Sequence, residues 1–131
     1  MSHECCAPQT PSQTPHALHL ARVFWPDTVI YEDRVYFDIP DADYFAELMD
    51  FAEHDPITVQ ALLNHQHLLD LAGDATLDRP ALIEFGQRLQ ACWQTCFAAQ
   101  YPDRPIVVAF DPQDEDADDE LQIVFYEETA E

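Results

Sequence analysis

Aspartate and proline mark the start of three helical segments in the middle of the chain. The signals are Pro40-Asp41, Asp55-Pro56 and Asp78-Arg79-Pro80, and the segments after them run to about residues 54, 72 and 100. Aspartate is a favoured N-cap, and proline is favoured at the first helical position. Apolar residues recur at steps of three and four in each segment, so we expect three amphipathic helices.

Short runs rich in β-branched and aromatic residues flank the helical segments. Residues 28–31 and 34–39 enclose Glu32-Asp33, a two-residue connection that is compatible with a hairpin turn. Residues 106–110 and 121–126 predict two further strands after the third helix. The order ββαααββ favours an α+β fold, with one antiparallel four-stranded sheet and about three helices on one of its faces.

The beginning of the chain, residues 1–17, is predicted to be a tail. Pro8, Pro11 and Pro15 lie there among Gln, Ser and Thr, which favours extended and solvated backbone. Residues 18–131 are then expected to form a single domain of ordinary length. The first residues have neither the basic start nor the apolar stretch of a secretion signal. No apolar run approaches the roughly 20 residues that span a bilayer. A cytoplasmic location is therefore expected.

The charge of the chain is its most unusual property. Twenty-six Asp and Glu residues stand against five Arg and no Lys, which gives a formal net charge of −21. This surface repels the phosphates of nucleic acids and anionic membranes, and it attracts basic proteins. An acidic surface adapted to high salt would have a similar composition, so the charge alone leaves both interpretations open.

Two groups of acidic residues are the candidate partner-binding sites. Asp43, Glu47 and Asp50 follow one stripe of the first helical segment, opposite its apolar side. The second group lies before the last strand and consists of Asp111, Asp114, Glu115, Asp116, Asp118, Asp119 and Glu120. Its spacing begins like a calcium-binding EF-hand loop, but the required glycine and the final glutamate are missing, so no tight calcium site is expected.

Rows of carboxylates can occupy a basic groove in place of nucleic-acid phosphates. The leading hypothesis is therefore a protein-binding protein that acts as a nucleic-acid mimic. Such a protein would inhibit or neutralise a basic nuclease or nucleic-acid-binding protein. Monomer and dimer are both compatible with the sequence. No nucleophile–base pair, metal triad or glycine-rich phosphate loop is found, so neither catalysis nor a cofactor is expected.

Histidine and cysteine residues support an alternative hypothesis. His65 is predicted on the apolar side of the second helix, and Cys92 and Cys96 share one face of the third. The three would form a small-molecule or metal site if these helices packed together, although a structural zinc site needs a fourth ligand. Burial of both cysteines in the core is the competing interpretation. The adjacent Cys5-Cys6 has no matching ligands elsewhere in the chain.

Overall fold

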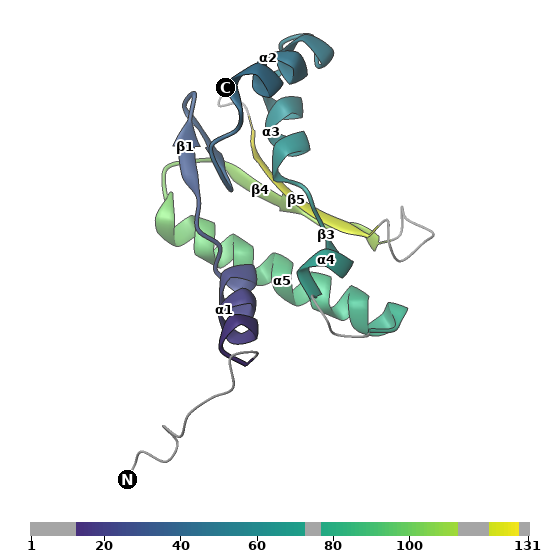
Figure 1. Ribbon diagram of the computed structural model, residues 1–131. Helices are drawn as coiled ribbons and strands as arrows, with labels where there is room; N and C mark the ends of the chain where they lie inside the picture. The colour runs from purple at the N-terminus through teal and green to yellow at the C-terminus, as the bar shows by residue number, and fades with distance from the viewer. Residues whose placement is uncertain (1–12, 73–76, 113–120, 129–131) are drawn as a thin grey trace.

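A computed structural model of the chain describes residues 13–72, 77–112 and 121–128. The α+β class is confirmed, because the described residues form helices and two small antiparallel sheets (Figure 1). None of the described helices has both the length and the hydropathy needed to cross a membrane. The elements are α1 (Gln13–Phe24), β1 (Val29–Tyr31), β2 (Arg34–Tyr36), α2 (Ala42–Phe51), α3 (Pro56–Asn64), β3 (Gln66–His67), α4 (Leu68–Ala72), α5 (Arg79–Gln100), β4 (Ile106–Ala109) and β5 (Gln122–Glu127).

The three predicted helix starts are confirmed. Asp41, Asp55 and Asp78 are the N-caps of α2, α3 and α5. Each aspartate side chain accepts a hydrogen bond from a backbone N–H of the first turn, at 3.0, 3.2 and 3.0 Å respectively. These bonds satisfy N–H groups that have no partner inside the helix, which is why the local sequence alone fixes where the helices begin.

The predicted hairpin is also confirmed. Glu32 and Asp33 have φ angles of 50° and 64°, so both lie in the left-handed region that a two-residue hairpin turn requires. β1 and β2 pair in antiparallel register on either side of this turn. The strands are three residues each, and the hairpin therefore depends on packing against the rest of the molecule.

The expectation of one four-stranded sheet is wrong. β1 and β2 form a sheet of their own, and a second sheet has the strand order β3-β5-β4. The edge of β2 that faces the second sheet is satisfied by side chains instead of a neighbouring strand. The carbonyl of Val35 accepts hydrogen bonds from the side-chain amides of Gln60 and Asn64, both at 2.9 Å. The N–H of Val35 donates to the carboxylate of Glu127 at 2.9 Å. These bonds leave no backbone group of Val35 for a further strand.

The single helix expected over residues 56–72 is divided into α3, β3 and α4. The break comes at His65, whose ψ of 148° is extended. Residues 66 and 67 then pair with β5, and the N–H of Leu68 donates to the carbonyl of Leu121 at 3.0 Å. Strand pairing with a distant part of the chain therefore overrides the local helical pattern.

α1 begins at Gln13, inside the stretch that was expected to be a tail. Pro15 falls in its first turn, where a missing N–H is tolerated. The helix also includes Val23 and Phe24, for which no helix was predicted. Residues 1–12 lie outside the described part of the chain, so the division into tail and domain remains a prediction.

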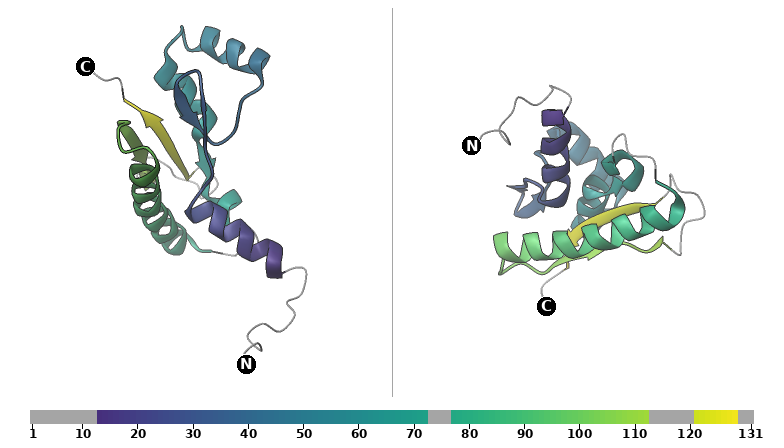
Figure 2. Two further views of the ribbon diagram at one scale, coloured as in Figure 1. Left: turned by 90° about the vertical axis from the view of Figure 1, so that its left-hand side faces the viewer. Right: turned by 90° about the horizontal axis from the view of Figure 1, so that it is seen from below.

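The core lies where α5 runs along β4 and β5 (Figure 2). The rings of Phe37, Trp93 and Phe97 surround Phe125, with centroids 5.0, 6.4 and 4.5 Å from it. Gly86 lets the ring of Phe110 approach α5, because a Cβ at residue 86 would lie 2.4 Å from that ring. The fully buried apolar residues include Val35, Val59, Leu68, Leu82, Leu89, Cys96, Leu121 and Ile123.

The two faces of β5 carry different elements. Phe125 faces α5, as its ring contacts show. Val124 and Tyr126 point the opposite way, because successive side chains of a strand alternate between faces. On that second face, they line a pocket together with Ala61 and His65 of the α3 segment. α3 therefore borders the face of β5 that is opposite α5, and it lies along the edge of the strand, where the N–H of Glu127 donates to the side-chain oxygen of Gln60 at 2.8 Å.

Tyr36, at the end of β2, makes the stability of the fold sensitive to alkaline pH. Burial raises the pKa of Tyr36 to about 12, and Arg34 offsets part of this rise. Between the ordinary tyrosine pKa of about 10 and this higher value, the unfolded chain loses the proton while the folded chain keeps it. Stability should therefore fall by roughly 2–3 kcal/mol as the pH rises from about 10 to about 12.

This prediction is checked by urea denaturation of the wild type and of Tyr36→Phe at pH values across that range. The unfolding free energy of the wild type should fall relative to that of Tyr36→Phe as the pH rises, because only the wild type carries the Tyr36 hydroxyl. Burial also raises the pKa of Cys96. This thiol is present in both proteins, so its contribution cancels when the two unfolding free energies are compared. A difference that stays constant over the whole range would contradict the prediction.

Candidate functional site

α2 is the helix that the fold buries least. None of its residues is buried. Phe45 attaches it to the hairpin, and the ring of this residue lies 5.1 Å from that of Tyr31 and 6.3 Å from that of Tyr36. α2 also contacts α3, and Figure 1 shows it at one end of the molecule. Nearly all of its outer surface is therefore available to a partner.

The three acidic residues predicted on this helix are on its exposed surface. Asp43, Glu47 and Asp50 are all exposed. His54, one turn after Asp50, places its Nε2 atom 3.8 Å from the Asp50 carboxylate, with both side chains more than 70% exposed. No lysine or arginine occurs in α2. The three carboxylates thus lie together on the exposed surface of α2, and no lysine or arginine of this helix neutralises their charge.

The surroundings of α2 extend the acidic surface. All ten acidic residues between positions 27 and 55 are exposed. The only arginine or lysine in that stretch is Arg34, and it turns inward. Its guanidinium donates to the side-chain oxygen of Gln60 at 2.7 Å and to the carbonyl of Glu127 at 3.0 Å. The hairpin, α2 and the start of α3 therefore form a surface with no balancing cation of their own, which we call the acidic face.

Large apolar side chains interrupt the acidic face. Phe51 and Tyr44 belong to the apolar side of α2, yet they are 76% and 52% exposed, and Ile39 just before the helix is 62% exposed. The sequence pattern indicates an apolar side but not that it stays uncovered. Exposed aromatic side chains among charged groups are typical of protein interfaces, where aromatic residues act as anchors.

The second predicted acidic group lies away from α2 as far as it is described. Asp111 follows β4, at the end of the sheet where Ala109 pairs with Val124. α2 adjoins α3, whose Gln60 contacts Glu127 at the other end of β5. The structure therefore does not bring Asp111 to the carboxylates of α2. The remaining members of this group, Asp114, Glu115, Asp116, Asp118, Asp119 and Glu120, lie outside the described residues.

A buried polar network holds the acidic face on the core. The carboxylate of Glu127 is 6% exposed and accepts hydrogen bonds from Gln60 at 2.7 Å and from Arg104 at 2.7 Å. Arg104 also donates to the carbonyl of Asp33 in the hairpin turn at 2.9 Å. The hydrogen bond to Glu127 raises the pKa of Arg104. Residues from the hairpin, α3, the segment before β4, and β5 thus meet at one ion pair.

Little in the sequence predicts this network. Glu127 directly follows the strand that was predicted over residues 121–126, and it resembles the other acidic residues near it. The available signal is the pair Gln60 and Asn64, two amides one turn apart in a helix whose only other polar residue is Thr58. Both are fully buried. Buried amides need hydrogen-bond partners, so their spacing indicates a backbone edge close to this side of α3.

The alternative site at His65, Cys92 and Cys96 is not assembled. His65 lines the pocket on the Val124 face of β5, whereas Cys96 is buried in the core on the α5 side. The Nδ1 atom of His65 is 2.8 Å from the carbonyl of Leu62, and the ring contacts His67 at a centroid distance of 5.3 Å. Among the described residues, no group of three His, Cys, Asp or Glu side chains could hold a metal ion. The contact between His65 and His67 is a consequence of the helix ending at residue 64.

No protein-family model matches the chain, and no curated protein or solved structure shows significant similarity to it. The function must therefore be inferred from the charge and the geometry of the chain itself.

Proposed function

We propose that this chain is a binding protein whose acidic face, centred on α2, occupies the basic site of another protein. The observation that supports this most is the coincidence of two properties in one helix. α2 carries three exposed carboxylates and no lysine or arginine, and it also exposes Phe51 and Tyr44. Solubility alone favours carboxylates but not exposed aromatic rings, so the combination favours a partner surface.

The chemistry of the partner follows from the charge. A basic groove that normally binds nucleic acid would attract the carboxylates of α2 over a long range and accelerate association. The exposed aromatic rings would then contact apolar side chains or aliphatic stems within that groove. In this proposal the protein competes with nucleic acid for the groove and performs no bond-making chemistry. A cytoplasmic location belongs to the same proposal.

Two variants with the same net charge test whether position or total charge matters. The first is Asp43→Asn/Glu47→Gln/Asp50→Asn. The matched control removes three exposed carboxylates outside the acidic face, as Asp70→Asn/Glu84→Gln/Asp111→Asn. Each protein is immobilised, exposed to host lysate at low salt and eluted with a salt gradient, and duplex DNA is then added as a competitor to the retained protein.

The wild type and the control variant should retain the same basic protein. The α2 variant should release it at much lower salt, because short-range carboxylate contacts are lost while the net charge of the two variants is equal. DNA should displace the partner from the wild type. Equal losses in both variants would mean that the binding is unspecific charge attraction, and retention that is insensitive to salt would exclude an electrostatic mechanism.

A further inference from the structure

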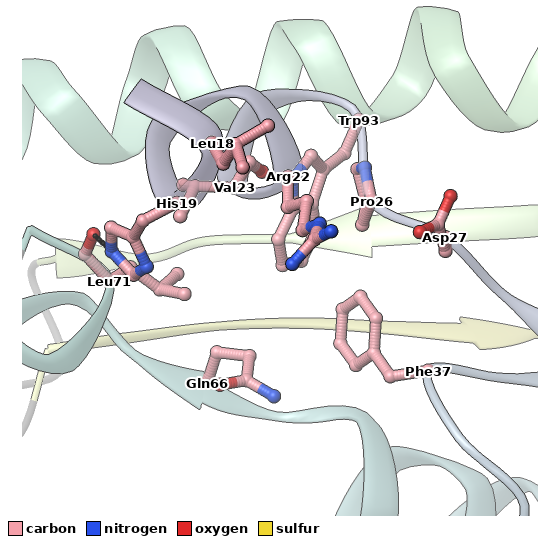
Figure 3. A pocket seen from close by; sticks show the side chains of 10 residues that line it. All are labelled: Leu18, His19, Arg22, Val23, Pro26, Asp27, Phe37, Gln66, Leu71 and Trp93. Carbon is pink, nitrogen blue, oxygen red and sulfur yellow. Dashed lines mark hydrogen bonds between the residues drawn. The ribbon is translucent and has the colours of Figure 1, made fainter. Parts of the chain in front are cut away.

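A cavity of about 600 Å³ opens beside α1, on a part of the molecule that the acidic face does not include (Figure 3). Its apolar walls come from α1, α4, α5 and the segment after β2, and include Val23, Leu71, Trp93 and Phe37. This volume lies within the range of about 300–1,000 Å³ in which proteins hold small molecules. The cavity is thus large enough for a ligand with an apolar body.

Arg22 is the cation of this cavity. It lines the cavity from α1 and remains exposed to solvent (Figure 3). Within the described residues its guanidinium makes no hydrogen bond or ion pair, whereas the four other arginines all have partners. In a chain with 26 carboxylates and five arginines, an arginine at a cavity with no partner in the described part of the chain is unexpected from composition alone. Its position leaves five N–H donors for a ligand.

The other polar groups around the cavity restrict what the ligand can be. His19 Nε2 is hydrogen-bonded to the carbonyl of Leu71 at 3.0 Å, and the indole N–H of Trp93 donates to the carbonyl of Val23 at 2.8 Å. Both side chains therefore present mainly their carbon surfaces to the cavity. Asp27 lies toward one end and repels a second negative charge. A ligand with one anionic group is thus favoured over one with several.

We infer that this cavity binds an amphipathic monocarboxylate. The apolar body of the ligand packs on Leu18, Phe37 and Leu71, and its carboxylate accepts hydrogen bonds from the guanidinium of Arg22. Planar guanidinium groups bind carboxylates in a bidentate manner, which gives both affinity and orientation. The net charge of −21 opposes the entry of any anion, so a preference for an anionic ligand must come from a local cation. The inference is independent of the proposed function, since α2 contributes nothing to the cavity.

Decanoate and decanol separate the contribution of the charge from that of the apolar body. Isothermal titration calorimetry measures both with the wild type, with Arg22→Gln and with the control Arg88→Gln. Arg88 is an exposed arginine of α5 that pairs with Glu84, so the two variants change the net charge equally. Both substitutions are at exposed positions, and circular dichroism confirms that each variant is folded.

The wild type should bind decanoate at least about tenfold more tightly than decanol, since hydrogen bonds to a charged group are worth that much. Arg22→Gln should remove this preference and leave decanol binding unchanged, and Arg88→Gln should keep the preference. The inference is overturned if decanoate does not bind, if the wild type does not prefer decanoate over decanol, or if Arg88→Gln reduces the preference as much as Arg22→Gln does.

Discussion

Replacing Glu127 with alanine is expected to lower the free energy of unfolding by about 3–5 kcal/mol. The carboxylate is buried, and it accepts hydrogen bonds from the N–H of Val35, the amide of Gln60 and the guanidinium of Arg104. Removing it leaves these three donors without their acceptor and leaves Arg104 with only the exposed Asp33 as counter-charge. Unsatisfied buried donors and an uncompensated charge are among the most costly defects in a protein interior. Urea denaturation followed by circular dichroism measures the loss.

The neighbouring Glu128 provides the matched control for this prediction. Its side chain is exposed. Glu128→Ala changes the net charge by the same amount, and it should alter the unfolding free energy by no more than about 0.5 kcal/mol. If the two variants unfold at the same urea concentration, the ion pair between Glu127 and Arg104 does not hold the hairpin on the core.

The second large effect is expected at Trp93. Trp93→Ala should destabilise the protein by about 3–5 kcal/mol, which is the usual cost of removing a large buried aromatic side chain. Trp93 is 1% exposed, and its ring packs against Phe37 and Phe97 at centroid distances of 5.3 and 6.1 Å. The substitution therefore removes these core contacts and extends the cavity beside α1 into the core. Thermal and urea denaturation both report this loss.

Trp93→Phe distinguishes packing from hydrogen bonding at the same position. Phenylalanine keeps an aromatic ring in the core but removes the N–H that donates to the carbonyl of Val23 at 2.8 Å. We expect a smaller loss of about 1–3 kcal/mol, together with faster amide hydrogen exchange in α1. If exchange in α1 is unchanged in Trp93→Phe, packing alone attaches this helix to α5.

Elements with a local signal could be predicted from the sequence. Asp41, Asp55 and Asp78 mark helix starts because an N-cap needs only residues of the next turn. Glu32-Asp33 marks the hairpin because the length of the connection limits the type of turn. Both kinds of signal act over fewer than about five residues, and no distant part of the chain changes them here.

Elements that depend on distant contacts could not be predicted. The helical pattern continues through His65, and only pairing with β5 shows that the helix ends before it. The four predicted strands do not form one sheet, because Gln60 and Asn64 satisfy the edge of β2. α1 escaped prediction because Pro15 and its polar neighbours indicate an extended tail.

The candidate site shows the same division. The exposure of Asp43, Glu47 and Asp50 follows from helical spacing and could be predicted. The exposure of Phe51 could not, because an apolar stripe on a helix normally indicates burial. Arg22 likewise has no distinguishing neighbours in the sequence, and only the fold shows that it lies at a cavity and has no hydrogen-bond or ion-pair partner among the described residues.

The position of β5 has a consequence for synthesis on the ribosome. β5 is the last described element along the chain, yet it is the central strand between β3 and β4. Val35 and Glu127 are joined across 92 residues. The three-stranded sheet and the contact between the hairpin and β5 therefore cannot form until residue 127 has left the exit tunnel. Until then the nascent chain exposes the apolar surfaces of α5 and β4. Chaperones bind such exposed apolar surfaces, and aggregation starts from them.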